Sequence, residues 1–370
     1  MRIVKVPLGR RSYEIKIGRG LLTRLGHECA RLELNPRCVI VSDRHVAPRY
    51  GHVAQAALAK AGFEAAQVTI PAGETAKSLK TLAACYDRLA AQRLERKSFI
   101  VALGGGVVGD LAGFLAATYL RGLPFVQVPT TLLAQVDSSV GGKVGLNLAA
   151  GKNLVGAFHQ PRLVLCDLDT LASLPMREFR AGLAEVIKYG IIYDAGLFRR
   201  LERDLPKLLG RDPSTLAAVV ARCCEIKADV VRQDERESGL RAILNFGHTI
   251  GHALESETKY HSLLHGEAVA WGMIAATNIA LSVGRTDSVT AGRIADAVLS
   301  LGRLPEVNVS SKKILARLQS DKKTQNGVVH FILPREIGKV EVASDVPESA
   351  VVDAVEELRR LSRGGWVWGK

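Results

Sequence analysis

Short apolar runs rich in β-branched residues alternate with longer helical stretches through the first half of the chain. Such runs lie at 37–43, 66–71, 98–110, 125–129 and 162–168, the third continuing into a glycine turn and a helix start. Helical stretches are expected at about 45–61 and 75–93. Parallel strands are joined by crossovers of about a dozen residues or more, usually helices, so the alternation predicts a doubly wound parallel α/β sheet. The alternating residues of IVKV and YEIKI predict a hairpin at its edge.

Helical periodicity replaces the strand pattern after Leu174-Pro175. Helices are expected over 177–192 and 215–231, and in two histidine-containing segments that follow. A last strand-like run at 328–334 precedes a closing helix near 347–362. Because 370 residues are many for one hydrophobic core, we predict two domains, 1–174 with the parallel sheet and 175–370 mostly helical.

Charge and cysteine content narrow the possible functions. The chain has 50 Lys and Arg against 37 Asp and Glu, a net charge of +13, but no basic block with interleaved aromatic residues. An anionic small-molecule substrate or a generally basic proteome therefore explains the charge better than nucleic acid does. The six cysteines form no C-x-x-C pair, which favours reduced thiols in a cytoplasmic protein. The N-terminus has no apolar leader and no run is long enough to cross a membrane.

The segment 241–272 carries three histidines in otherwise apolar helical sequence. His248 and His252 are four residues apart and so share one helix face, and His265 begins the next helix. Two inward imidazoles with a carboxylate and an open position suit a divalent metal. Glu185 is the best carboxylate because its neighbours are apolar, although an ion pair with Lys188 is an alternative. Capping and core histidines are the other interpretation.

A glycine turn follows the strand near residue 100. Gly104, Gly106 and Gly109 fit G-x-G-x-x-G between a strand and a helix, the context of a pyrophosphate site. The turn does not follow the first strand, so a tight strand–helix connection is the alternative interpretation. Asp43, at the end of an earlier strand, is placed to bind ribose hydroxyls.

The polar, glycine-rich segment 128–161 is expected to be a functional loop. Asp137, Lys143, Lys152 and Asn153 lie among its glycines, and lysines beside flexible backbone suit phosphate or carboxylate binding. A solvated surface loop is the alternative.

Several long motifs together resemble the 3-dehydroquinate synthase family. They are LGGGVVGDLAGFLAATYLRG, VPTTLLAQVDSSVGGKVGLNL, GKNLVGAFHQP, GLAEVIKYGII, LNFGHTIGHALE and HGEAVAWGM. The resemblance implies an NAD-binding Rossmann-like N-terminal domain, a helical metal-binding C-terminal domain and a homodimer. It also implies conversion of a heptulosonate phosphate to dehydroquinate in the shikimate pathway. The remaining alternatives are cyclases that make deoxy-inosose or valiolone, glycerol-type dehydrogenases and a nucleic-acid-binding module.

The resemblance also implies residue roles. The implied ligands of Zn²⁺ or Co²⁺ are Glu185, His248 and His265. The resemblance makes His252 a residue on the substrate side instead of a metal ligand. The implied NAD contacts are Asp43, Gly73, Glu74, Lys77, Gly104, Gly105, Gly106, Val107, Val108, Gly109, Asp110, Thr130, Thr131, Lys143, Lys152, Thr170 and Ser173. The implied catalytic residues are Asp137, Lys143, Lys188, Lys227, Arg241, Asn245 and His252, and the implied substrate-binding residues are Arg121, Lys152, Asn153 and Lys323.

Two of these roles carry a further expectation. Arg121 resembles an arginine that reaches the partner subunit's phosphate site, and either Lys322 or Lys323 fills the late lysine position. Arg241 and Asn245 precede His248 by seven and three residues, so a continuous helix would place them on the side of the metal. If Gly247 instead permits a bend, they can still flank the metal-bound substrate. A guanidinium suits a substrate carboxylate, although an ion pair of Arg241 with Glu237 is the alternative.

Overall fold

The computed structural model describes residues 1–237, 239–258, 262–320 and 329–364. The chain forms two compact units, which are described separately. Unit 1 comprises Met1–Pro175 and Arg211–Glu235, and unit 2 comprises Met176–Gly210 and Arg236–Lys370. No helix in the described ranges is both long and apolar enough to cross a membrane.

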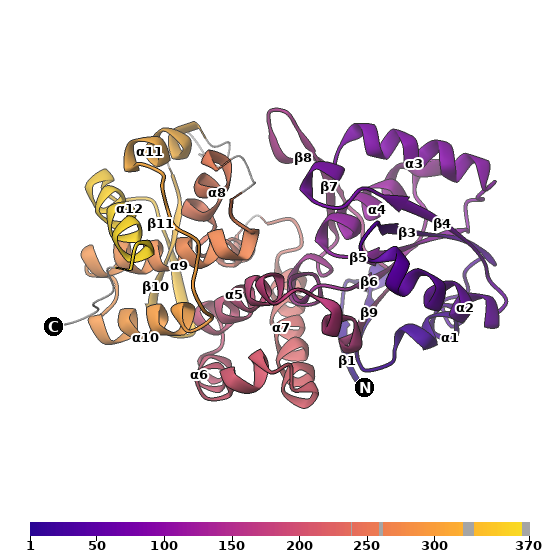
Figure 1. The fold of residues 1–370 in the computed structure, drawn as a ribbon, viewed down its shortest axis with the longest axis horizontal. Coiled ribbons are helices and arrows are strands. Elements are labelled where there is room, and N and C mark those ends of the chain that lie inside the picture. Colours follow the sequence, from indigo (N-terminus) through magenta and orange to yellow (C-terminus); the bar gives the residue numbers. More distant parts are fainter. Residues whose placement is uncertain (238, 259–261, 321–328, 365–370) are drawn as a thin grey trace. The chain divides into compact units, whose positions relative to one another are not determined.

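Unit 1 is built on a seven-stranded sheet (Figure 1). In spatial order its strands are β1 (Arg2–Val6), β2 (Tyr13–Gly18), β9 (Leu163–Asp167), β6 (Phe125–Pro129), β5 (Phe99–Gly104), β3 (Arg37–Asp43) and β4 (Glu64–Ile70). All neighbours are parallel except β1, which forms an antiparallel hairpin with β2 at the edge. The predicted doubly wound sheet and its edge hairpin are therefore confirmed.

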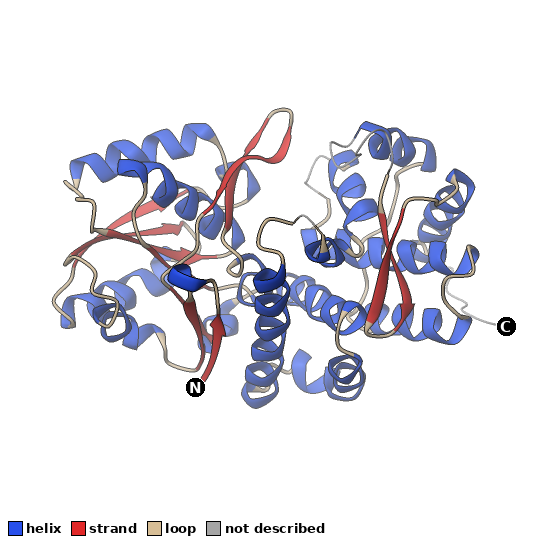
Figure 2. Ribbon diagram, turned by 180° about the vertical axis from the view of Figure 1, so that it is seen from behind, coloured by secondary structure: helices blue, strands red, loops and turns tan. Residues whose placement is uncertain are grey.

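Helices cover both faces of this sheet (Figure 2). Alternate residues of one strand face opposite ways, so Val39 and Val41 pack with α3 and α4 while Ile40 packs with α1 and α2. The helices are α1 (Leu25–Ala30), α2 (His52–Lys60), α3 (Leu79–Ala91) and α4 (Gly106–Thr118). Short 3-10 or π-helical turns are η1 (Gly9–Arg11), η2 (Leu22–Arg24), η3 (Ala47–Gly51), η4 (Glu74–Ala76), η5 (Tyr119–Arg121), η6 (Ala134–Ser138) and η7 (Leu168–Ser173).

The segment predicted as a long loop contains a β-hairpin beside α4 (Figure 1). Strands β7 (Lys143–Leu148) and β8 (Gly151–Phe158) pair antiparallel. Val144 and Leu146 are buried in the core with α4, which gives the ribbon one apolar face. The loop prediction for this part of 128–161 was wrong because glycines and polar residues hide the two-residue alternation.

Helix α7 (Pro213–Gln233) belongs to unit 1, although the sequence placed all of 175–370 in the helical domain. It packs on β1, β2 and η6, and the Cys224 thiol donates to the carbonyl of Gln135 at 3.3 Å. Apolar periodicity predicts that a segment is helical, but it does not say which unit that helix packs against.

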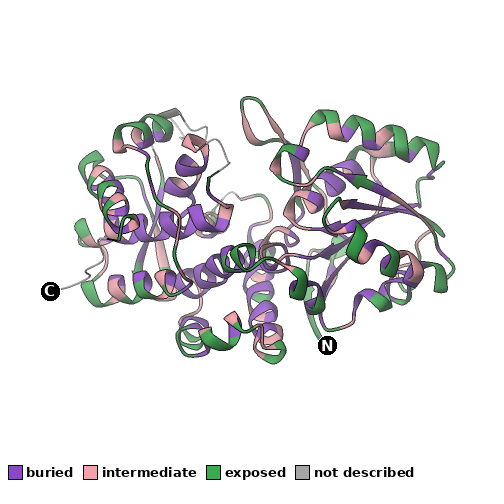
Figure 3. Cartoon of the chain, in the orientation of Figure 1, coloured by how far each residue is buried: buried purple, intermediate pink, exposed green. Residues whose placement is uncertain are grey.

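Unit 2 surrounds a central helix, α9 (His265–Ser282), which is buried along most of its length (Figure 3). It packs against α5, α8, α10, α12 and β10. The other elements are α5 (Met176–Ile192), α6 (Ala195–Leu209), η8 (Leu240–Asn245), α8 (His248–Glu257), α10 (Ser288–Leu299), α11 (Ser311–Ser320), β10 (Phe331–Glu336), β11 (Lys339–Ala343) and α12 (Glu348–Ser362).

Glycines let α5 and α8 approach α9 closely. A Cβ at Gly272 would overlap the carbonyl oxygen of Gly247, and one at Gly266 would overlap the carbonyl of Ala181. A Cβ at Gly251 would lie 3.0 Å from the carbonyl of Ala268. Backbone rather than flexible side chains forms these contacts, so the helices could accept a larger residue only by moving apart.

We expect Gly272→Ala to destabilise the protein by more than about 2 kcal/mol, because overpacking a rigid backbone contact costs about 1–3 kcal/mol or more. Chemical unfolding measures the change. Gly292→Ala in α10 is the matched control, since nothing lies within 4 Å of its added Cβ. This control should be neutral or stabilised by about 0.5–1 kcal/mol. Equal stability of the two variants would contradict the packing argument.

Candidate functional site

One face of α5 meets the first turn of α9 over three successive turns. Arg177, Ala181 and Glu185 recur every four residues and so share this face. The guanidinium of Arg177 binds the carboxylate of Glu267 at 2.7 and 2.8 Å. Ala181 contacts Gly266, as described above, and Glu185 faces His265. This alignment fixes the carboxylate of Glu185 against the imidazole of His265.

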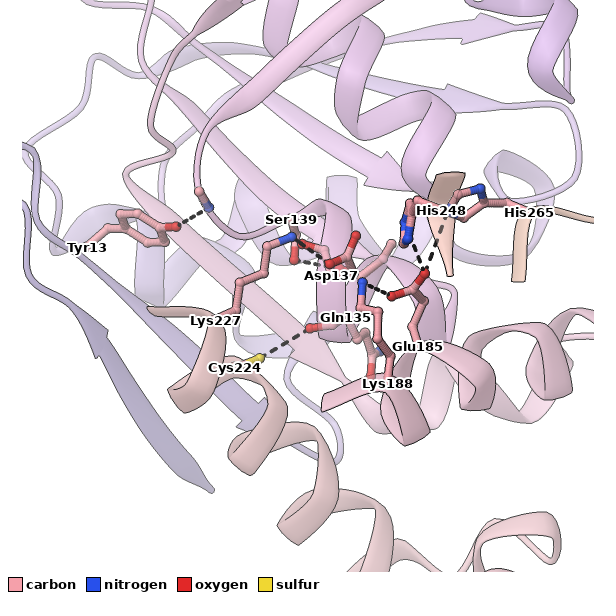
Figure 4. A network of polar contacts seen from close by, with 12 residues as sticks. Tyr13, Gln135, Asp137, Ser139, Glu185, Lys188, Cys224, Lys227, His248 and His265 are labelled. Carbon is pink, nitrogen blue, oxygen red and sulfur yellow. Dashed lines mark hydrogen bonds and ion pairs between the residues drawn. The ribbon is translucent and has the colours of Figure 1, made fainter. Parts of the chain in front are cut away.

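Glu185, His248 and His265 form a compact cluster in unit 2 (Figure 4). The Nε2 atoms of His248 and His265 each lie 3.6 Å from Oε1 of Glu185. Two atoms bound tetrahedrally to one zinc at about 2.0–2.1 Å lie about 3.3–3.4 Å apart. The spacing thus suits three ligands of a single divalent ion.

Outer contacts orient both imidazoles. Nδ1 of His248 lies 3.0 Å from the carbonyl oxygen of Phe246, and Nδ1 of His265 lies 3.3 Å from Oε2 of Glu255. An N–H on Nδ1 that donates to these oxygens leaves the Nε2 lone pair directed at Glu185, an arrangement typical of metal-ligating histidines. Burial, followed by the nearby Lys188 charge, lowers the pKa of His248 well below its ordinary value, which favours the neutral ligand form.

The carboxylate of Glu185 fits a bound cation. Its side chain is fully buried, and Oε1 accepts no hydrogen bond from any residue that the structure describes. Lys188 forms an ion pair with Oε2, so the predicted alternative pairing is present but leaves Oε1 facing the two imidazoles. A buried carboxylate oxygen without a donor is costly unless a cation compensates it.

His252, Glu255 and His265 form a second group with ligand spacing, which shares one histidine with the first. The ring centroids of His252 and His248 lie 5.2 Å apart, and those of His252 and His265 lie 6.0 Å apart. Here Glu255 contacts Nδ1 of His265, the nitrogen that faces away from Glu185. The geometry therefore favours Glu255 as a carboxylate that orients the His265 ring, rather than as a ligand of a second metal ion.

Arg241 and Asn245 do not continue the helix that carries His248. They lie in η8, which ends before the extended residue Phe246, and Gly247 then adopts φ 77°. Of the two arrangements left open by the sequence, the structure has the bend, because this left-handed glycine separates the two helices. Arg241 is 2% exposed, and the amide of Asn245 donates to Glu237 at 2.8 Å.

The sheet of unit 1 has its topological switch at β3. The chain passes from β3 to β4 on one side and then to β5 on the other. Ligands of open α/β sheets bind at the carboxyl ends of such strands. Asp43 ends β3 and Gly104 ends β5, so these predicted cofactor residues lie at the switch. Oδ1 of Asp43 accepts from the backbone N–H groups of His45 and Val46 at 2.8 and 3.1 Å.

The glycine turn after β5 leads directly into α4. Gly105 is the N-cap residue, and Gly106–Asp110 form the start of the helix, where backbone N–H groups attract anions. The side chain of Val108 packs against Gly104, so the intervening turn is tight. Thr130 donates its N–H to the carbonyl of Gly104 at 2.9 Å, and Thr131 lies next to Gly105. The predicted residues 104–110, 130 and 131 therefore gather at one edge.

A polar network joins further predicted cofactor residues. Nζ of Lys77 lies 2.5 Å from Oδ2 of Asp110 and 2.5 Å from Oδ1 of Asn153. Burial raises the pKa of Asp110, and the Lys77 charge opposes this. Glu74 receives a hydrogen bond from Asn147 at 2.7 Å. Sequence reasoning missed Asn147, and its only signal was its place inside a glycine-rich motif.

The other predicted residues of unit 1 are more dispersed. Nζ of Lys227 donates to the carbonyl and to Oδ1 of Asp137, both at 2.7 Å (Figure 4). Lys143 begins β7 and Lys152 lies in β8. Thr170 and Ser173 belong to η7, and Tyr50 donates to Ser173 at 2.7 Å.

Two predicted substrate-binding positions complete the set. Arg121 is exposed in η5 with φ 68°, a conformation that non-glycine residues rarely adopt. Lys322 and Lys323 lie outside the described residues.

The two units have the fold of solved sugar phosphate cyclases. The chain is similar to 2-epi-5-epi-valiolone synthase from Streptomyces hygroscopicus subsp. jinggangensis, solved with NAD⁺ and Zn²⁺, at 31% identity and a TM-score of 0.88, with 98% of this chain and 100% of that chain covered. It is similar to a 2-deoxy-scyllo-inosose synthase complexed with carbaglucose-6-phosphate, NAD⁺ and Co²⁺ at 28% identity and a TM-score of 0.89, with 96% and 100% covered.

Sequence similarity is higher to another member of this class. Family models described as the 3-dehydroquinate synthase N-terminal and C-terminal regions match residues 67–181 and 182–324. A 3-dehydroquinate synthase of Koribacter versatilis is 50% identical over 363 residues, which cover 98% of this chain and 99% of the relative. The chain belongs to the 3-dehydroquinate synthase family.

We expect His248→Ala to lose its bound metal, because two remaining protein ligands rarely hold zinc firmly. Metal content after dialysis measures this. His252→Ala is the matched control: it removes an imidazole from the same helix but not from the Glu185 cluster, and should retain one ion per chain. Loss of metal only from His252→Ala would assign the ion to the second group instead.

Proposed function

We propose that the protein converts 3-deoxy-D-arabino-heptulosonate 7-phosphate to 3-dehydroquinate and phosphate. The observation that carries this proposal is the Glu185–His248–His265 cluster, with its unsatisfied carboxylate oxygen, in a chain half identical to a 3-dehydroquinate synthase. The proposal includes a tightly bound NAD, one Zn²⁺ or Co²⁺ ion, a homodimer and a cytoplasmic location.

Glu185, His248 and His265 would hold the metal through Oε1 and the two Nε2 atoms. A divalent ion there would supply Lewis-acid stabilisation of negative charge developing on substrate oxygens. Lys188 neutralises part of the Glu185 charge through Oε2, so the cluster carries one buried ion pair beside the cation site. The Lys188 side chain lies next to the proposed ligands, and this placement supports the catalytic role proposed for it.

The carboxyl ends of β3 and β5 would hold NAD, with Asp43 toward the ribose and the start of α4 toward the pyrophosphate. Bound NAD would supply reversible hydride acceptance for this chemistry, and it would not be consumed. The Lys227–Asp137 pair fixes a buried lysine in the same unit. Such a fixed charge suits binding of an anionic substrate.

In this proposal, lysines and one arginine bind the phosphate group of the substrate. Lys143 and Lys152 lie in the hairpin, and Lys323 is proposed although it lies outside the described residues. Arg121 is proposed to reach the partner subunit of the dimer, and its exposure in η5 supports an intermolecular role. The enzyme's net charge of +13 agrees with a substrate that carries both phosphate and carboxylate.

Incubation of metal-loaded protein with the heptulosonate phosphate and catalytic NAD is the direct test. We expect one phosphate and one dehydroquinate per substrate, because elimination and ring closure belong to one turnover. Absorbance of NADH should not accumulate with product, since the hydride is returned. Stoichiometric NADH would instead assign the protein to the dehydrogenases.

Arg241 should distinguish this reaction from that of the sister cyclases, whose sugar phosphates lack a carboxylate. A buried guanidinium can bind a carboxylate through two charge-assisted hydrogen bonds. We expect Arg241→Ala to keep metal and NAD but to lose about 2–4 kcal/mol in kcat/KM, which is about 30- to 1000-fold. Steady-state kinetics measures the loss.

Exposed Arg200 on α6 offers the control, and Arg200→Ala should behave like the wild type. Glucose 6-phosphate and sedoheptulose 7-phosphate should be turned over negligibly by the wild type. Efficient cyclisation of either sugar phosphate, with no effect of Arg241→Ala, would move the assignment to the sister enzymes.

A further inference from the structure

Asn147 lies at an irregularity of the β7–β8 hairpin. Leu146 pairs with Val155, and the register then shifts before Leu148 pairs with Gly151, so Asn147 falls in the gap. Its backbone N–H donates to the carbonyl of Lys77 at 2.9 Å, in the segment that follows β4. Bulges of this kind redirect a side chain and often lie next to active sites.

The side chain of Asn147 uses both ends of its amide. Nδ2 donates to Oε1 of Glu74 at 2.7 Å, and Oδ1 accepts from the backbone N–H of Asn153 at 3.0 Å. Asn153 has φ 53°, a left-handed conformation that asparagine tolerates better than most residues. Asn147 therefore holds one carboxylate and one strained backbone position at the same time.

Lys77 closes this arrangement into a ring of polar contacts. Its ammonium binds Oδ1 of Asn153 and Oδ2 of Asp110, as described above, and its carbonyl receives the N–H of Asn147. The ring links three segments of unit 1, namely residues 74–77, the first turns of α4 and the hairpin. Glu74, Lys77, Asp110 and Asn153 are all proposed ligand contacts, and Asn147 is the connecting residue between them.

We propose that Asn147 is a positioning residue for the bound dinucleotide. It acts by fixing Glu74 and Asn153, so that the 74–77 segment and the hairpin form one ordered surface before the nucleotide arrives. Preorganised segments bind more tightly because less conformational entropy is lost on association. This inference rests on the proposed use of NAD.

Only asparagine and glutamine combine a donor and an acceptor in one neutral amide. Aspartate at this position would keep the acceptor for Asn153 but would place a second carboxylate against Glu74, where like charges repel. Alanine would remove both contacts and leave only the backbone hydrogen bond to Lys77.

Asn35 provides a matched control in the same unit. Its amide also donates to a glutamate, Oε2 of Glu95 at 3.1 Å, and its N–H also donates to a lysine carbonyl, that of Lys97 at 3.1 Å. It lies just before β3, and Glu95 and Lys97 lie just before β5, at the amino ends of the strands. Asn35 thus repeats the chemistry at the opposite edge of the sheet from the proposed nucleotide site.

The test measures NAD affinity by calorimetry on the metal-loaded protein, together with kcat at saturating NAD. The loss of two hydrogen bonds predicts that Asn147→Ala weakens NAD binding about 5-fold or more. Its kcat at saturating NAD should stay within about threefold of the wild type, since no reacting atom is touched. Asn35→Ala should bind NAD like the wild type.

Exchanging the amide and the carboxylate of the Asn147–Glu74 contact separates a positioning role from a general loss of structure. Asn147→Asp should bind NAD more weakly than Asn147→Ala. Because Glu74 is itself a proposed NAD contact, the double variant is compared with Glu74→Gln alone: Asn147→Asp should cost less NAD affinity in the Glu74→Gln background than in the wild type, since the new amide can donate to the new carboxylate. Wild-type NAD affinity in Asn147→Ala, or an equal cost of Asn147→Asp in both backgrounds, would overturn the inference. Failure of the wild type itself to bind NAD would instead overturn the proposed function.

Discussion

The helical unit depends on a carboxylate that is buried without a full set of donors. Glu185 has no exposed side-chain surface, and its Oε1 faces two imidazoles rather than a donor from the described residues. A buried charge with only one cationic neighbour is unfavourable, so the fold must keep Lys188 and the space for a cation in place together. The close glycine contacts of α9 with α5 and α8 make this possible, because they hold both imidazoles within 3.6 Å of one oxygen.

Unit 1, which contains the sheet, is suited to a different kind of ligand from the metal ion proposed for unit 2. A dinucleotide is long and anionic, and unit 1 offers it strand ends and a helix start rather than a single concentrated charge. The Lys77 and Lys227 ammonium groups are each paired with a carboxylate, Asp110 and Asp137 respectively. Both lysines are buried, and the pairs fix their positions. A lysine held in this way is better suited to orienting a bound ligand than to attracting it over a distance.

Much of this architecture was predictable from the sequence because apolar periodicity reports burial. The strands ending at Asp43 and Gly104 and the helix carrying Glu185 were all correctly located. The hairpin was missed because glycines and polar residues hide its two-residue alternation and a register shift interrupts it. The membership of α7 in the sheet unit was missed because it depends on packing between distant segments. The roles of the site residues are predictions that rest on the motifs, whereas spacing alone left His248 and His252 equivalent.

Some of the positions with irregular backbone lie beside the proposed sites. Gly247 takes a left-handed conformation directly before His248, Asn153 does so within the hairpin, and Asn147 interrupts the β7 register. The left-handed conformation of Asn153, unlike that of a glycine, costs conformational free energy, so surrounding contacts must compensate for it. The three proposed metal ligands lie on α5, α8 and α9, so their spacing depends on the connections between helices as well as on helical periodicity. An irregular backbone position beside a proposed site is therefore a reason to look for a functional role. Asn147 is such a position, because it lies at the register shift of the hairpin, although the sequence assigned it no ligand role.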